Sequence, residues 1–123
     1  MDLNKISGEI IDSAMKVHST LGAGLLESVY ETCLSHELRK RGLKVETQVA
    51  LPVFYDGLKL DAGYRIDLLV ENAVIVELKT AEHFLPIHEA QLLSYLKLSG
   101  KKLGLLLNFN VVHFKNGIKR LIN

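Results

Sequence analysis

The chain has 123 residues, 48% of them hydrophobic and 24% charged, with a formal net charge of +1. This balance is typical of a globular protein, and we expect one domain over residues 1–123. The charge excludes nucleic-acid binding driven by overall charge, and the single cysteine, Cys33, excludes a disulfide framework. No leader pattern and no run long enough to span a membrane is present, so we expect a cytoplasmic protein without membrane contacts.

Two helices are predicted in the N-terminal third. Apolar residues at helical spacing indicate a first helix over residues 6–18, with Asn4 or Ser7 as its cap. Two glycines in residues 21–24 end this helix, and a second is expected over residues 25–41. Its expected apolar stripe consists of Leu26, Val29, Cys33 and Leu38.

The pattern then changes to that of strands. Residues 45–51 alternate between apolar and polar side chains, which predicts a strand. Asp56-Gly57 is a strong hairpin signal between residues 53–55 and 58–60. Residues 64–80 read as two apolar strands joined by a short turn.

The C-terminal third adds a helix and more strands. Pro86 suits the first turn of a helix over residues 86–99. Residues 103–109 are almost entirely apolar and predict a buried strand, and strands are also expected over residues 111–114 and 118–122. The order of elements predicts an α/β fold in which a mixed central β-sheet is flanked by helices on both faces.

Charged side chains interrupt the apolar strands of residues 64–80, and the length of the turn decides where they point. With a two-residue turn, Asp67 would face Val76, and Glu77 would lie on the other side of the sheet. With a three-residue turn over residues 71–73, Asp67 lies opposite Glu77. Arg65 then lies opposite Lys79. We expect the three-residue turn, because it gathers the charges on one face and leaves the apolar side chains for the core.

Two carboxylates on one face suit a hard divalent cation such as Mg²⁺, which prefers oxygen ligands. Lys79 would then orient the attacking water or stabilise the developing anion. The alternative is a buried salt-bridge network in which Arg65 and Lys79 neutralise Asp67 and Glu77. Spacing alone leaves both interpretations open.

Polar residues on the predicted helices extend the candidate site. Gln91 and Tyr95 share one face of the third helix, and His88 lies close to them. They form either a polar seam to solvent or a substrate-binding face. Glu27 and Tyr30 are three residues apart on the second helix, where Glu27 is either an anion favoured by the helix dipole or a third carboxylate.

Together these residues resemble the PD-(D/E)XK nuclease superfamily, and most closely the GxxExxY family within it. Residues 24–30 match the naming motif, and Asp67 matches the metal-binding aspartate of the superfamily. Residues 77–79 match its (D/E)-x-K, and residues 91–95 resemble the additional Gln-x-x-x-Tyr motif of exonuclease-type members. The departures, Ala23 for a frequent proline and Ile66 before the aspartate, touch no proposed ligand.

The resemblance implies a restriction-endonuclease-like core and a metal-dependent nuclease. Asp67 and Glu77 would bind Mg²⁺ (or Mn²⁺), and Glu27 would complete the acidic site. Lys79 would act on the water and Gln91 would support it. The remaining candidates, expected to contact substrate, are Tyr30, Arg65, His88 and Tyr95.

We therefore expect a nuclease that hydrolyses phosphodiester bonds, with nucleic acid, in particular DNA, as its partner. A set of basic side chains either lines a phosphate-binding groove or is a solvated surface. This set is Lys97, Lys101, Lys102, Lys115, Lys119 and Arg120. Two alternatives stay open: a non-catalytic module that binds nucleic acid or protein, and a structural charge network inside an oligomer such as a homodimer.

Overall fold

The computed structural model describes residues 1–123 and contains three α-helices, a five-stranded sheet and a separate two-stranded sheet. The helices are α1 (Leu3–Leu21), α2 (Glu27–Lys40) and α3 (Pro86–Ser99), and a short 3₁₀ helix, η1, covers Phe114–Gly117. The strands are β1 (Val45–Ala50), β2 (Val53–Tyr55), β3 (Leu58–Leu60), β4 (Arg65–Val70), β5 (Val74–Lys79), β6 (Leu103–Asn108) and β7 (Ile118–Ile122).

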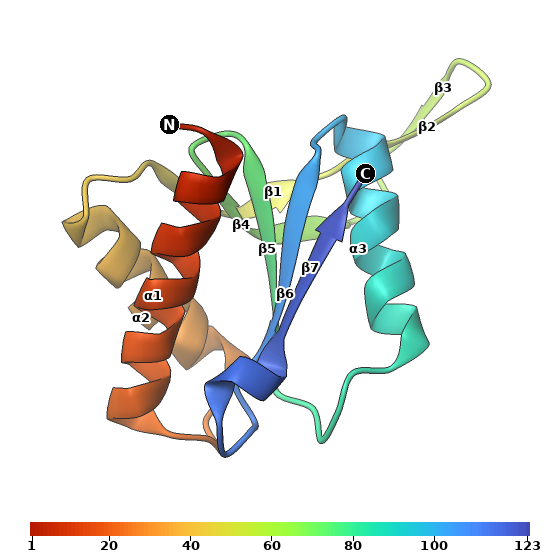
Figure 1. Cartoon of the computed structure of the whole chain (residues 1–123). Helices are drawn as coiled ribbons and strands as arrows, with labels where there is room; N and C mark the ends of the chain where they lie inside the picture. The colour runs from red at the N-terminus through yellow and green to blue at the C-terminus, as the bar shows by residue number, and fades with distance from the viewer.

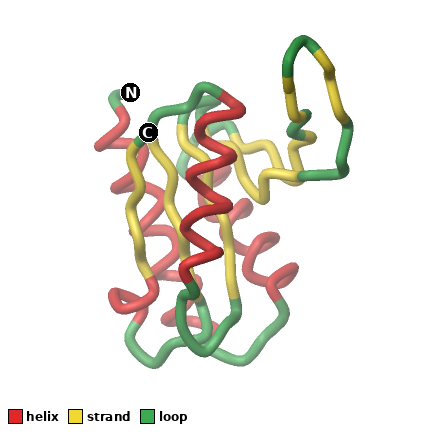
Figure 2. The backbone as a smooth tube through the Cα atoms, turned by 90° about the vertical axis from the view of Figure 1, so that its right-hand side faces the viewer, coloured by secondary structure: helices red, strands yellow, loops and turns green.

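The five-stranded sheet has the order β1-β4-β5-β6-β7 and is mixed, because β5 and β6 are parallel and the other pairs are antiparallel. Figure 1 shows α1 and α2 on one face of this sheet and α3 on the other. The tube in Figure 2 shows α3 lying along the sheet while the β2–β3 hairpin projects away from the body. The predicted α/β fold is confirmed and is consistent with a restriction-endonuclease-like core.

Each face of the sheet has its own hydrophobic core. On the α1–α2 face, the aromatic side chains of Tyr30, Phe109 and Phe114 pack together. On the α3 face, Leu92 and Leu96 pack against the sheet. Because both faces are covered, β6 is buried along its whole length, as its apolar sequence predicts.

The predicted helices are present, but two details of them were wrong. The cap of α1 is Asp2, whose Oδ1 accepts a hydrogen bond of 2.8 Å from the Lys5 amide, in place of Asn4 or Ser7. On α2, half of the expected stripe is wrong, because Leu26 is 73% exposed and Val29 is 36% exposed, whereas Leu38 is buried and Cys33 packs against the core as predicted. The helix is rotated so that its buried side chains recur four residues apart instead, at Tyr30, Leu34 and Leu38.

The expected strand over residues 111–114 is also wrong. Here the chain bends and forms η1, and the Val111 carbonyl lies 2.7 Å from Nε2 of the α1 residue His18. Phe114 turns into the aromatic cluster, 4.9 Å from Phe109 between ring centroids. Tertiary packing therefore overrides the strand propensity of this segment, and β7 follows as predicted.

None of the three helices is both long and apolar enough to cross a membrane.

A glycine in η1 is required by a close backbone approach. A Cβ built on Gly117 would lie 2.1 Å from the carbonyl oxygen of Asn108 at the end of β6. We expect Gly117→Ala to lower the free energy of unfolding by about 2–3 kcal/mol, since neither backbone can yield easily. Gly8→Ala in α1 is the matched control, because a Cβ built on Gly8 meets nothing within 4 Å. This substitution should raise the free energy of unfolding by about 0.5–1 kcal/mol. Urea denaturation measures both changes, and equal stability of Gly117→Ala and wild type would contradict the close approach.

Candidate active site

The turn between β4 and β5 has three residues, 71–73, and the strands pair as Val70 with Val74 and Leu68 with Val76. Glu71 and Asn72 adopt positive φ angles of 54° and 51°. Glu71 is anchored there, because its carboxylate accepts a 2.7 Å hydrogen bond from the Lys44 amide. The predicted three-residue turn is thus confirmed, and continuing this register places Asp67 opposite Glu77.

The regular pairing of β4 with β5 ends just before these two carboxylates. The Asp67 amide donates a 2.8 Å hydrogen bond to Oε2 of Glu77. In return, Oδ2 of Asp67 accepts one of 2.8 Å from the Leu78 amide. Side-chain oxygens therefore replace main-chain carbonyls as acceptors at this point, which holds both carboxylates between the two strands.

The carboxylate pair forms no ion pair, although the charge of Lys79 acts on Glu77 and lowers its pKa by less than burial and Asp67 raise it. Glu77 is 4% exposed, and its burial, followed by the charge of Asp67, raises its pKa to about 8. No Lys, Arg or His nitrogen lies within 4.0 Å of either carboxylate, since the ion pairs of the chain involve other acidic residues. The alternative of a salt-bridge network with Arg65 and Lys79 is therefore wrong for the single chain. One buried and one half-buried carboxylate without an ion-pair partner fit a hard divalent ion.

Gln48 contributes to the site and was missed in the sequence. It has a positive φ of 52° in the middle of β1. Its Nε2 donates hydrogen bonds to the Glu31 carboxylate and, at 3.3 Å, to Oδ1 of Asp67. Gln48 was given no role from the sequence, but the register of β1 with β4, in which Thr47 pairs with Leu68 and Val49 with Ile66, places it opposite Asp67.

The expected site of three carboxylates is not assembled in the structure. Glu27 lies exposed in the first turn of α2, and it lines a small hollow of about 120 Å³ together with Asp67 and Leu78. However, no group of three or more His, Cys, Asp or Glu side chains is arranged to hold a metal ion. Like charges separate where no cation draws them together. The structure thus brings Asp67 and Glu77 together as a pair, with Glu27 nearby.

A larger hollow, of about 600 Å³, lies between the end of β5 and α3. Lys79, Gln91 and Tyr95 line it together, and Lys79 forms no ion pair there. Burial first, and then the carboxylates of Glu77 and Asp67, raise the pKa of the Tyr95 hydroxyl, which keeps it protonated. The hollow therefore presents a cation, an amide and a phenol beside the acidic pair.

His88 lines the same hollow but also has a structural role. Its Nδ1 accepts a 3.0 Å hydrogen bond from the Leu85 amide and so caps α3. Arg65 is exposed and donates a 2.9 Å hydrogen bond to the carbonyl of its neighbour Tyr64. The expected role of His88 and Arg65 in substrate binding stays a prediction.

Tyr30 has no exposed surface with which to contact a substrate, which counts against the predicted contact. It is fully buried, its ring stacks on Phe109 at 4.5 Å, and its hydroxyl donates a 2.6 Å hydrogen bond to the Gly22 carbonyl. The same hydroxyl accepts a 3.2 Å bond from the Leu25 amide. Tyr30 therefore holds the loop before α2 and in this way positions Glu27.

Of the two alternatives for the six basic residues, a phosphate-binding groove or a solvated surface, the structure favours the solvated surface, because none of them lines the hollows of this site. Lys119 pairs with Glu89 at 2.9 Å, and Arg120 donates a 2.7 Å bond to Asn4. Lys101 and Lys102 precede β6, which runs parallel to β5, so they lie at the opposite end of the sheet from Lys79. None of the six lines either hollow.

Asn108 fixes the chain just beyond Lys79. Its buried amide accepts a 3.2 Å bond from the Ala81 amide and donates one of 2.8 Å to the Ala81 carbonyl. The Phe109 amide also donates a 3.0 Å bond to the Lys79 carbonyl. The end of β5 is thereby clamped to β6, which orients Lys79. The sequence offered no signal for this role.

A family model described as PD-(D/E)XK nuclease superfamily matches residues 4–121. The chain belongs to the PD-(D/E)XK nuclease superfamily. Nucleases of this superfamily generally use divalent metal ions and act on nucleic acids. No match to a curated protein or to a solved structure was found. Asp67, Glu77 and Lys79 are the residues in which the sequence resembles the superfamily motif, so we take the geometry above as the candidate active site.

The raised pKa of Glu77 predicts how the stability of the metal-free protein depends on pH. The folded chain holds a proton on Glu77 up to about pH 8, whereas the unfolded chain loses it near pH 4.5. The stability that the folded chain gains from this bound proton is complete below pH 4.5 and is lost as the pH rises to about 8. The melting temperature in EDTA should therefore fall over that pH range. Glu77→Gln should flatten this fall.

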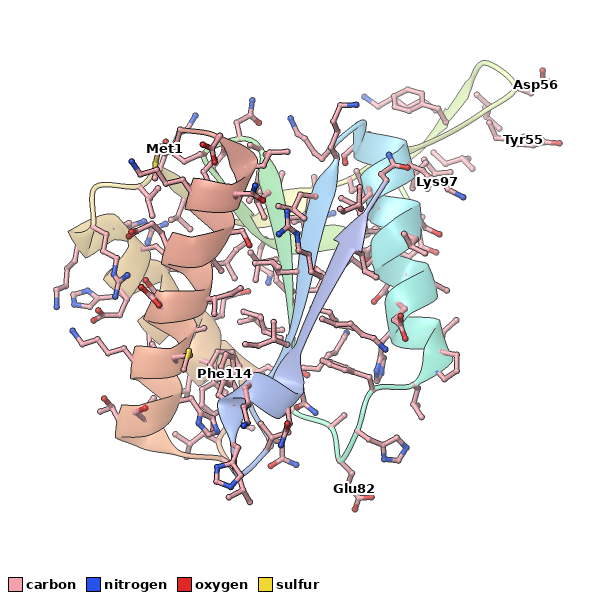
Figure 3. The ribbon with its side chains drawn as sticks, viewed as in Figure 1. Met1, Tyr55, Asp56, Glu82, Lys97 and Phe114 are labelled. Atoms are coloured by element: carbon pink, nitrogen blue, oxygen red, sulfur yellow. The ribbon has the colours of Figure 1, made fainter.

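The matched control is Glu82→Gln, which removes an exposed carboxylate in the loop after β5, labelled in Figure 3. It should keep the pH dependence of wild type. Thermal unfolding at several pH values measures all three proteins, and a wild-type melting temperature that does not fall between pH 5 and pH 8 would contradict the buried, protonated Glu77.

Proposed function

We propose that this protein is a Mg²⁺-dependent nuclease that hydrolyses phosphodiester bonds in DNA. We further propose that it is a GxxExxY-family member and that residues 1–123 form one nuclease domain. The observation that carries the proposal is the pair of the buried Glu77 and the half-buried Asp67, hydrogen-bonded across β4 and β5 without an ion pair, beside Lys79, which forms no ion pair either.

Each residue of the candidate site has its own role in the proposed reaction. Asp67 and Glu77 hold the ion, and the exposed Glu27 approaches it from α2. A bound divalent ion lowers the pKa of a coordinated water and neutralises charge on the phosphate. The Lys79 ammonium, which has no carboxylate partner, orients the attacking water or stabilises the developing anion. Gln91 supports the phosphate or water by hydrogen bonding from the α3 side.

The protonation of Glu77 links metal binding to pH. Without a cation, Glu77 keeps its proton up to about pH 8. An ion binds the deprotonated carboxylate, so it must displace this proton, and affinity for the ion rises with pH. Activity therefore increases from acidic to mildly alkaline pH in this account.

One observation favours a second function, a module that binds nucleic acid without cutting it. The carboxylates are not arranged as a ready-made site of three ligands, because Glu27 stays apart from the pair. A module of this kind would use the same hollows for binding and would not need Lys79 as a catalyst. Cleavage measurements separate the two functions.

We expect labelled DNA to be cut in Mg²⁺ or Mn²⁺ and to stay intact in EDTA. Lys79→Ala and Asp67→Asn should each lower the rate by about 10²–10³-fold, a loss typical of removing one group that stabilises developing charge. Lys102→Ala is the matched control, since it removes an exposed lysine far from the site and should keep the wild-type rate.

Two results would count against the proposal. Cleavage that survives both Lys79→Ala and Asp67→Asn would remove the proposed site. Salt-sensitive DNA binding without cleavage in any divalent metal would favour the binding module.

A further inference from the structure

The large hollow beside Lys79 also contains an exposed aromatic residue to which no role has been given so far. Tyr64 directly precedes β4, lines this hollow, and is 44% exposed. Its ring meets that of Tyr95 edge-on, with the centroids 6.0 Å apart and the planes at 61°. Because Tyr95 is itself buried at 5% exposure, it provides a fixed support for Tyr64. Tyr64 is therefore an accessible aromatic ring held in place beside the candidate site.

The walls of this hollow are mainly apolar and aromatic. Ile87, in the first turn of α3, is 67% exposed there, and Lys79 is the one Lys or Arg residue among the lining side chains. The other basic residues of the C-terminal third lie elsewhere, as described above. A protein that grips an intact duplex contacts many phosphates with Lys and Arg. These walls lack that feature and instead fit the flat faces of nucleobases, which stack on aromatic side chains.

The position of Tyr64 in the chain connects it to the chemistry. Asp67 follows it by three residues, and Lys79 and Gln91 line the same hollow. A nucleic-acid strand whose phosphate reaches Lys79 therefore enters the hollow that Tyr64 also lines. The volume of about 600 Å³ is within the range of sites that enclose small organic groups.

We propose that Tyr64 is a stacking platform for an unpaired nucleobase, and that the substrate is a single strand or a single-stranded end. An internal base of a duplex is covered on both faces by its neighbours, so it cannot stack on Tyr64 without leaving the helix. This inference rests on the proposed nuclease function for the identity of its ligand. It adds the form of the substrate and a positioning residue outside the metal site.

Binding of fluorescein-labelled DNA, measured by anisotropy with Ca²⁺ in place of Mg²⁺, tests the inference separately from cleavage. Wild type should bind a single strand more tightly than a blunt duplex of the same sequence. Tyr64→Ala should weaken single-strand binding by about 5–150-fold, the equivalent of one lost base–aromatic stack, and duplex binding should hardly change. Tyr64→Phe should keep the wild-type affinity, because stacking needs the ring and not the hydroxyl.

The matched control is Tyr55→Ala. Tyr55 is 73% exposed and lies at the tip of the β2–β3 hairpin, away from the body, as Figure 3 shows. It does not line the hollow, so its removal should leave the affinity unchanged. Melting temperatures of all three variants establish that each one folds.

The outcomes separate the two proposals. If DNA is cut in Mg²⁺ but Tyr64→Ala alters neither affinity nor strand preference, the stacking inference is wrong and the nuclease proposal stands. If single strands bind in a Tyr64-dependent way and no DNA is cut, the nuclease proposal fails and the stacking inference stands. Equal affinity for duplex and single strand, an equal loss in Tyr55→Ala, or no binding of either DNA would overturn the inference.

Discussion

The site depends on a pair of reciprocal hydrogen bonds between β4 and β5. The Asp67 amide binds the Glu77 carboxylate, and the Leu78 amide binds the Asp67 carboxylate. These contacts hold two acidic groups side by side within a largely apolar sheet, where a negative charge without a partner is unfavourable. Burial and the charge of Asp67 therefore raise the pKa of Glu77 to about 8. A divalent cation would supply the positive charge that the pair lacks.

The rest of the fold serves to place groups around this pair. Tyr30 uses its buried hydroxyl to hold the loop before α2, and this brings Glu27 to one side. Asn108 clamps the chain after β5 and so orients Lys79 on the other side. Some motif residues of the sequence thus lie at the site, and others stabilise the segments that surround it. The GxxExxY pattern contains one of each kind, since its glutamate is exposed and its tyrosine is buried.

Much of this architecture could be predicted because it follows from local patterns. The period-two strands, the helix that starts at Pro86 and the three-residue turn at 71–73 each have a sequence signal with a physical cause. The errors arose where distant parts of the chain decide the outcome. Residues 111–114 had the composition of a strand, but Phe114 is drawn into an aromatic cluster with Phe109. In the same way, Leu26 and Val29 fit a helical spacing, but α2 packs through Tyr30, Leu34 and Leu38.

In the proposed site, Asp67 and Glu77 together bind a divalent cation. Calorimetric titration with Mn²⁺ near pH 6, in buffers of different ionisation enthalpy, tests it most directly because it counts the protons released on binding. We expect the release of close to one proton per ion, displaced from Glu77, and loss of Mn²⁺ binding in both Asp67→Asn and Glu77→Gln. Binding of Mn²⁺ with unchanged affinity in either variant, or without proton release in the wild type, would contradict it.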